Sequence, residues 1–169
     1  MDSGTILHVN VSAGGIPKRS VPEAYLAPTG LEGDSHAHPQ IHGGPLKAIL
    51  LITSEGLEEL RGQGYAVYSG ALGENFTTSG LDRRHMRIGD RYQAGRAVIE
   101  ITRLRTPCST LDIFNNPGLP RIQDAMYDLQ VKAGDPASPR WGLSGFYARV
   151  VNDGLVRPGD RITLLDALA

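Results

Sequence analysis

The 169-residue sequence contains a single cysteine, Cys108, and this scarcity excludes an internal disulfide. One thiol is consistent with a reducing compartment. The amino terminus lacks a basic region followed by an apolar one, which argues against a secretory signal. No run approaches the roughly 20 apolar residues that a membrane-spanning helix needs. We therefore expect a cytoplasmic protein that does not cross a membrane.

The chain also lacks a strong excess of charge of either sign. Its 17 Lys and Arg residues balance 18 Asp and Glu residues, which gives a net charge of −1. This total provides no general attraction for a nucleic acid polymer. A length of 169 residues suits one well-buried core and is short for two, so we predict one domain over residues 1–169.

Glycine and proline are abundant, with 21 and 11 residues, which indicates many turns and few long helices. We therefore expect a mainly β fold with short helices. Apolar patterns predict strands over residues 5–12, 46–53, 97–102, 141–151 and 155–165. The last two strands are predicted to form a hairpin that turns at 152–154. A short helix is predicted with Ser54 as its N-cap, and a second, amphipathic helix over 119–131.

Cys108 comes just after the predicted strand 97–102 and directly after Pro107. Proline ends a strand because it offers no N–H group and restricts the residue before it. A thiol there, near Arg103 and Arg105, is suited to act as a thiolate nucleophile or as a soft metal ligand. Cysteine outside disulfides is also commonly a small buried apolar residue. The local sequence leaves both interpretations open.

The glycine- and proline-rich stretch 28–45 holds three of the five histidines, and its length marks it as a candidate functional loop. His36, His38 and His42 suggest a zinc hydrolase, but the chain offers no clear carboxylate base at a fitting spacing. The two glycines after His42 would let a ligand approach the backbone closely. We favour contact with an anion or a cofactor over zinc, and a purely structural loop stays an alternative.

Seven arginines lie between residues 83 and 105, against two carboxylates, Asp90 and Glu100. In a chain that is otherwise balanced, this asymmetry points to a small anionic ligand rather than to a long polyanion. Most of these arginines are expected to be solvated, outward-facing strand residues.

Several short motifs follow one another along the chain: T-G-L-E-G-D-S-H at 29–36, H-G-G-P at 42–45, G-E-N-F-T-T-S-G-L at 73–81, R-I-G-D-R at 87–91, T-P-C at 106–108, G-F-Y-A-R-V at 145–150 and V-R-P-G-D at 156–160. With them the chain resembles the MOSC family, the domain found at the carboxyl end of molybdenum cofactor sulfurases and as stand-alone bacterial proteins. The resemblance covers most of the chain. It implies a MOSC-type β-barrel with a few short helices and a pocket for a molybdenum pterin cofactor, molybdopterin.

Position by position, the resemblance also implies roles for individual residues. Cys108 would either ligate molybdenum or carry sulfur. Ser35 stands where many relatives have a basic residue, so that phosphate contact would fall to His36 or be lost. The implied contacts of the phosphate end are Lys18, His36 and His42, and those around the pterin and metal are Asn75, Thr77 and Arg105.

The family divides over activity, and two functions follow from the resemblance. In the first, the chain is the cofactor-binding component of an oxidoreductase that acts on small N-hydroxylated compounds with electrons from a partner reductase. In the alternative, Cys108 holds a persulfide supplied by a cysteine desulfurase and passes sulfur to a molybdenum cofactor or a metal–sulfur cluster. In either function, we expect a recombinant sample to lose its pterin on purification and to contain an empty pocket.

Overall fold

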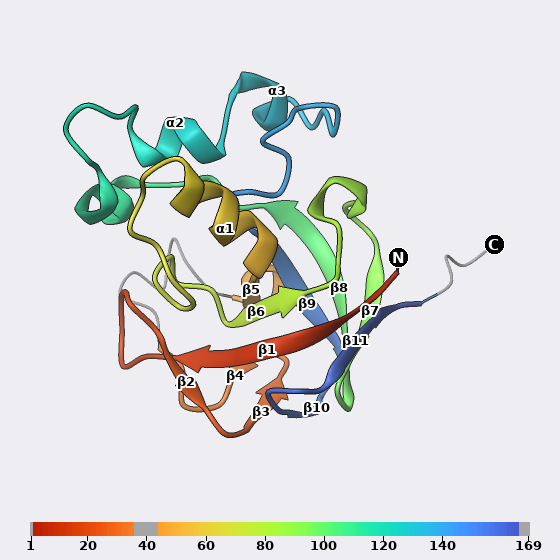
Figure 1. Cartoon of the computed structure of the whole chain (residues 1–169). Helices are drawn as coiled ribbons and strands as arrows, with labels where there is room; N and C mark the ends of the chain where they lie inside the picture. Colours follow the sequence, from red (N-terminus) through yellow and green to blue (C-terminus); the bar gives the residue numbers. More distant parts are fainter. Residues whose placement is uncertain (1, 36–43, 166–169) are drawn as a thin grey trace.

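The computed structural model describes residues 2–35 and 44–165, and within these ranges the fold is mainly β (Figure 1). Seven strands close into a barrel because β11 pairs with both β7 and β1. In barrel order they are β11 (Arg161–Leu164), β7 (Arg91–Ala94), β8 (Ala97–Leu104), β9 (Phe146–Asn152), β5 (Ile49–Thr53), β6 (Phe76–Ser79) and β1 (Ser3–Val11). The predicted β-barrel with a few short helices is confirmed.

Smaller elements surround the barrel. Strand β2 (Arg19–Val21) pairs with β1, and a second sheet contains β10 (Gly154–Val156), β3 (Ala24–Ala27) and β4 (Gly30–Leu31). The helical elements are α1 (Ser54–Gly62), α2 (Ile122–Met126) and α3 (Leu129–Lys132), with 3₁₀ turns η1 (Pro45–Lys47), η2 (Arg83–His85) and η3 (Ser109–Phe114). Figure 1 shows the three helices above the barrel and the small sheet below it. Within the described ranges, no helix combines the length and apolar character needed to span a membrane.

Apolar side chains pack in two clusters, one within the barrel and one between the barrel and the helices. Leu51, Phe76 and Phe146 belong to the barrel cluster. Ile52 belongs to the helix-side cluster, together with Leu57 and other residues of α1 and α2. Leu51 and Ile52 are adjacent in β5 yet join different clusters, since successive side chains of a strand point to opposite faces. This explains why β5 is buried along its whole length.

Both predicted helices differ from the observed ones. α1 begins at Ser54, but its N-cap is Thr53, whose hydroxyl accepts a hydrogen bond from the Gly56 N–H at 3.1 Å. The helix predicted over 119–131 is two short helices, α2 and α3. Between them Tyr127 and Asp128 are extended, and the Asp128 carboxylate caps α3 by accepting from the Val131 N–H at 2.8 Å.

The predicted hairpin at 152–154 is wrong. β9 pairs with β5 on one side and β8 on the other, while β10 pairs with β3 in the small sheet. Both edges of β9 are therefore already bonded inside the barrel wall, and the turn passes the chain to another sheet.

Candidate functional site

The register of the barrel strands brings distant residues to one edge. Phe76 of β6 pairs with Leu51 of β5, Leu51 pairs with Phe146 of β9, and Phe146 pairs with Leu104 of β8. The residues just before β6 and just after β8 therefore lie at the same edge of the barrel wall. Arg105 directly follows β8, and the predicted site residue Cys108 is the N-cap of the η3 turn.

Arg105 is a buried cation at this edge, with 4% of its surface exposed. Its backbone N–H donates to the Gly145 carbonyl at 2.9 Å, and its carbonyl accepts from the Ser144 hydroxyl at 2.6 Å. Its Nε and Nη1 groups have no hydrogen-bond partner within the described residues. A buried donor left unsatisfied costs about 1–3 kcal/mol. Two such donors on one guanidinium therefore indicate a place for an acceptor-rich ligand.

Cys108 is half-buried, and its thiol donates to the Thr110 hydroxyl at 3.1 Å. Its backbone carbonyl accepts from Gln123 Nε2 of α2 at 3.0 Å. The same Gln123 nitrogen donates to Asp112 Oδ1 at 2.7 Å, while the buried Gln123 Oε1 has no partner in the part of the chain described. Helix α2 thus fixes the turn that carries the thiol and leaves one acceptor unused.

Positive charge gathers around Cys108 and Tyr147. Burial lowers the pKa of Arg105, and its attraction to Tyr147 and Cys108 opposes that change. Burial also raises the pKa of Tyr147, whereas Arg105 and Arg103 lower it electrostatically. The Lys47 ammonium lies 5.2 Å from the centre of the Tyr147 ring, a cation–π distance. Arg105, which interacts with both Tyr147 and Cys108, therefore favours an anionic ligand at this edge.

Glu74, just before β6, is a carboxylate with no exposed surface. Its Oε1 accepts from the Leu72 N–H at 3.3 Å, and its Oε2 accepts from the Thr77 hydroxyl at 3.4 Å. Burial raises the pKa of Glu74 to about 7, although backbone N–H groups and Arg105 lower it. The site therefore contains an acid that titrates close to neutral pH.

The predicted contacts Lys18, Asn75 and Thr77 share one buried hydrogen-bond network. The Lys18 ammonium pairs with Asp34 at 2.6 and 2.8 Å. Asn75 Nδ2 donates to Asp34 Oδ2 at 2.9 Å and to the Asn10 carbonyl at 3.2 Å, and the Thr77 hydroxyl accepts from Asn10 Nδ2 at 3.2 Å. The structure brings the three residues together, but these polar atoms bond to the protein itself. Direct contact with a cofactor stays a prediction.

The predicted histidine contacts, His36, His38 and His42, lie outside the described residues. Within residues 2–35 and 44–165, no cluster of His, Cys, Asp or Glu side chains is arranged to hold a metal ion. The interpretation of these histidines as phosphate or zinc ligands therefore stays a prediction.

Sequence reasoning did not select Tyr147 or Gln123 as site residues, and for Glu74 it left open whether the carboxylate satisfies backbone groups or lines a pocket. Glu74 and Tyr147 lie inside the motifs G-E-N-F-T-T and G-F-Y-A-R-V, and a polar group beside a strongly apolar strand is a usable signal. Gln123 offers no local signal, because its partner Cys108 is 15 residues away.

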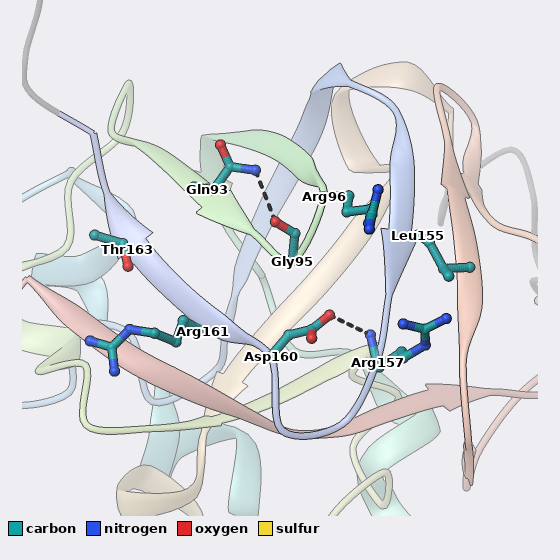
Figure 2. A pocket seen from close by; sticks show the side chains of 8 residues that line it. All are labelled: Gln93, Gly95, Arg96, Leu155, Arg157, Asp160, Arg161 and Thr163. Atoms are coloured by element: carbon teal, nitrogen blue, oxygen red, sulfur yellow. Dashed lines mark hydrogen bonds between the residues drawn. The ribbon is translucent and has the colours of Figure 1, made fainter.

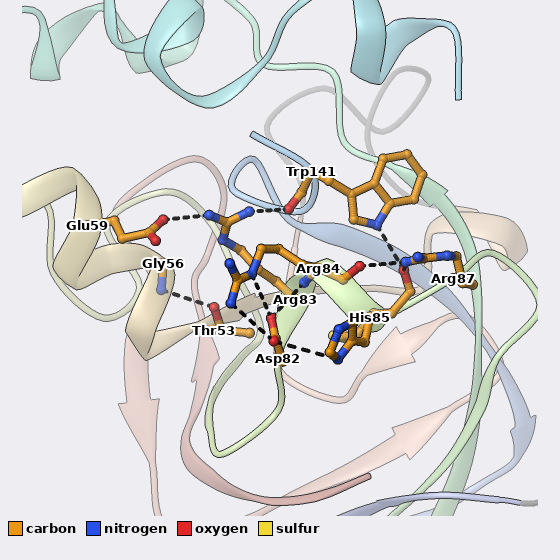
Figure 3. Close-up of polar contacts among 10 residues, drawn as sticks. Thr53, Gly56, Glu59, Asp82, Arg83, Arg84, His85, Arg87 and Trp141 are labelled. Carbon is orange, nitrogen blue, oxygen red and sulfur yellow. Dashed lines mark hydrogen bonds and ion pairs between the residues drawn. The ribbon is translucent and has the colours of Figure 1, made fainter. Parts of the chain in front are cut away.

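The arginine-rich segment does not form one basic patch. Figure 3 shows Arg83 between Glu59 of α1, to which it donates at 2.6 Å, and the carbonyl of Trp141. Arg84 pairs with Asp82 in the same view. Arg83 thus ties α1 to the segment before β9, while Arg84 makes a local, exposed ion pair at the start of η2.

An open cleft of about 280 Å³ lies at the start of β8, opposite to Arg105 along that strand (Figure 2). Three exposed arginines, Arg96, Arg157 and Arg161, line it. Its Gln93 donates to the Gly95 carbonyl at 2.9 Å, and its Asp160 accepts from the Arg157 N–H at 2.8 Å. In the same way, the Asp90 carboxylate accepts from the Arg87 N–H at 2.8 Å. The similar sequences I-G-D-R at 88–91 and P-G-D-R at 158–161 therefore form the same type of turn.

Comparisons with known proteins agree with the observed fold. The family model of the MOSC domain matches residues 38–163. The Bacillus subtilis protein YflK is 31% identical over 155 residues, which cover 89% of this chain and 63% of YflK. A Gibberella moniliformis protein named reductase is 29% identical over 149 residues, which cover 84% of this chain and 24% of that protein. The chain thus spans less than two thirds of the length of either relative.

Among solved structures, YiiM from Geobacillus stearothermophilus superimposes with a TM-score of 0.69 at 28% sequence identity. The match covers 96% of this chain and 75% of that chain. The barrel and its surrounding helices therefore have a close structural counterpart.

Proposed function

The chain belongs to the MOSC domain family, and on this premise we propose that it binds a molybdenum cofactor, molybdopterin, as the cofactor-binding component of a reductase acting on N-hydroxylated compounds. The family is related to the molybdenum cofactor, and one relative carries the name reductase. The observation that carries the proposal is the buried Arg105 guanidinium close to Cys108, whose Nε and Nη1 have no hydrogen-bond partner among residues 2–35 and 44–165.

The chemistry of the barrel edge fits such a cofactor. Arg105 offers donors in a planar arrangement that suits phosphate or carbonyl oxygens. The Gln123 Oε1 atom offers an acceptor for an amino group of a pterin. The thiolate of Cys108 is a soft donor suited to molybdenum. Donors, an acceptor and a metal ligand are therefore available together.

When bound, the cofactor would supply two-electron redox chemistry at the N–O bond of the substrate, with electrons from the partner reductase. Cys108 would hold the metal, and Arg105 would hold and neutralise an anionic group. Lys18, His36 and His42 remain the proposed contacts of the phosphate end. We assign Asn75 and Thr77 a place around the pterin, where their hydrogen bonds keep Asp34 and Glu74 in position.

The test is the molybdenum and pterin content of protein purified from its native source. Wild type and Cys108→Ala are compared with Ser109→Ala, an exposed neighbour that serves as the matched control. We expect molybdenum and pterin in wild type and in Ser109→Ala, and loss of molybdenum in Cys108→Ala. Equal molybdenum in all three proteins would contradict ligation by Cys108. Absence of both signals from wild type would contradict cofactor binding.

The half-exposed position of Cys108 favours sulfur transfer as a second candidate function. A cysteine desulfurase would place one sulfur on the thiolate, and the persulfide would pass that sulfur to an acceptor and return to the thiolate. Incubation with a desulfurase and cysteine should then produce one cyanide-reactive sulfur per chain in wild type. The same sulfur should be missing from Cys108→Ala and present in Ser109→Ala.

A further inference from the structure

Three oxygen-bearing side chains lead from the buried site towards the surface. Glu74 has no exposed surface, Thr77 is buried, and Ser69 is half-exposed. The Thr77 hydroxyl lies 3.4 Å from Glu74 Oε2 and 2.7 Å from the Ser69 hydroxyl. A hydroxyl both donates and accepts, so it can receive a proton on one side and release one on the other. The row therefore connects a buried acid to solvent.

The surroundings of Glu74 keep both protonation states accessible. Within the described residues, the charged group that faces the carboxylate is Arg105 from the end of β8. The Lys18–Asp34 ion pair is linked to this region through Asn10 and Asn75, and as a pair it is neutral. Burial favours the protonated acid, whereas Arg105 and backbone N–H groups favour the carboxylate. The balance lies at a pKa of about 7 for Glu74.

A purely structural role accounts poorly for a carboxyl group at this position. The Leu72 N–H and the Thr77 hydroxyl reach different oxygens of Glu74 at 3.3 and 3.4 Å, which is long for such hydrogen bonds. Contacts this weak offset little of the cost of desolvating a carboxylate. Buried acids whose protonation changes near the working pH are typical of proton transfer in active sites.

We propose that Glu74 is a proton-exchanging acid of this site and that the Thr77 and Ser69 hydroxyls form its path to solvent. Its use in the reaction rests on the proposed function. Reduction of an N-hydroxyl compound to an amine breaks the N–O bond, forms one N–H and one O–H bond, and releases water. It consumes two electrons from the partner reductase and two protons. Glu74 supplies one of these protons and regains it through Thr77 and Ser69.

The first test follows the carboxyl carbons by NMR in the full chain labelled with ¹³C-glutamate. The signal that Glu74→Gln removes is assigned to Glu74. We expect this carboxyl to titrate close to neutral pH, well apart from exposed glutamates near pH ~4.3. A Glu74 carboxyl that titrates with the exposed glutamates, or that keeps one charge from about pH 5 to about pH 9, would overturn the proposal.

The second test measures the path by infrared spectroscopy after transfer to D₂O at a pH where Glu74 is protonated. The C=O band of the acid should shift at once in wild type and in Thr77→Ser, which keeps the hydroxyl. In Thr77→Val the shift should slow by an order of magnitude or more (roughly tenfold), because exchange then requires local opening of the fold. Ser69→Ala, at the half-exposed end, should slow it without disturbing the core. Equal rates in all four proteins would exclude the path.

Both tests use protein without regard to its molybdenum content. Failure of cofactor binding therefore leaves the proton path testable, and failure of the proton path leaves the proposed cofactor site standing.

Discussion

The two ends of strand β8 both carry arginines, in opposite physical states. At the carboxyl end, Arg105 is 4% exposed, and two of its N–H groups lack partners among the described residues. At the amino end, Arg96, Arg157 and Arg161 line an open cleft and remain exposed. Water satisfies an exposed guanidinium, so a surface ion pair adds only about 0–1 kcal/mol. A buried guanidinium must find its partners in the protein or in a ligand.

The comparison teaches that burial and missing partners, more than the number of cations, distinguish a binding site. The cleft has three arginines, but its Asp160 and Gln93 are already bonded to backbone groups. The site end has a buried cation, a thiol and a buried acid whose interactions are linked through Arg105.

The largest effect is expected from Arg105→Gln. Losing one partner of a buried charged contact costs about 2–5 kcal/mol, so cofactor affinity should fall on the order of 100-fold or more. Arg103→Gln is the matched control, because Arg103 is two residues earlier and exposed. Pterin and molybdenum content after dialysis should fall in Arg105→Gln and stay close to wild type in Arg103→Gln. Equal retention by both variants would remove the distinction between the two arginines.

Glu74 should give the folded protein a specific dependence on pH. Its pKa is raised to about 7 in the folded state, against about 4.3 for an unfolded glutamate. Between these two pKa values the folded state binds more protons than the unfolded state. The stability that Glu74 contributes is therefore complete below the unfolded pKa and is lost as pH rises through the folded pKa. The loss is about 3 kcal/mol between pH ~4.5 and pH ~7.

Urea unfolding at several pH values measures this loss, with Glu74→Gln as the comparison. Glu100, whose pKa is lowered by hydrogen bonds from Arg149 and Arg91, contributes in the opposite direction and only at acid pH. The two profiles should therefore diverge between pH ~4.5 and pH ~7, with wild type losing the stability that Glu74→Gln does not lose. Parallel profiles would show that Glu74 has an ordinary pKa.

A moderate effect is expected from Gln123→Ala, which removes the bonds to the Cys108 carbonyl and to Asp112. The free energy of unfolding should fall by about 1–3 kcal/mol. Alkylation of the Cys108 thiol should also become faster, because its turn is less firmly held. Gln130→Ala in α3 is the matched control, since its bond to Asp135 is exposed, and it should change stability by less than ~0.5 kcal/mol. Unchanged alkylation in Gln123→Ala would deny the positioning role.

The smallest effect is expected at the cleft. Replacing both Arg96 and Arg161 by Gln should change stability by no more than about 0.5 kcal/mol. Molybdenum and pterin content should stay at the wild-type level. Loss of cofactor from this double variant would indicate that the binding site lies at the amino end of β8.

Much of the barrel could be predicted from the sequence, because a strand that is buried mainly on one face shows an alternation of apolar residues. The strand predicted over 97–102 is β8, and the one predicted over 5–12 is β1, each within about two residues at its ends. Alternation of apolar residues specifies both the strand and its buried face.

The helix predicted over 119–131 shows why such patterns fail elsewhere. Ile122 and Met126 pack in the cluster between barrel and helices, whereas Val131 packs in the barrel cluster. The apolar spacing continues along the sequence, but the residues serve two different cores. The chain must change direction at Tyr127 and Asp128, which a one-dimensional pattern does not reveal.

The site residues proposed from the sequence, Cys108 and Arg105 among them, stay predictions, but the structure shows where each described one lies. Motifs and the position after a strand identified Cys108 and Arg105. The family resemblance singled out Arg105, whereas the local sequence did not separate it from the exposed Arg103. The difference in burial comes from a turn far along the chain, which holds Arg105 through Ser144 and Gly145. In this turn Gly145 has φ +103, and a Cβ there would lie 2.8 Å from Ile52, so the turn approaches β5 closely. Long-range packing of this kind decides which of two similar residues is buried.

The most direct test of the cofactor site is anomalous X-ray diffraction at the molybdenum edge, from crystals of protein purified from its native source. We predict an anomalous peak within bonding distance of the Cys108 sulfur, on the side of the barrel edge occupied by Arg105. A molybdenum peak in the cleft between Arg96 and Arg161, or one remote from Cys108, would contradict the account.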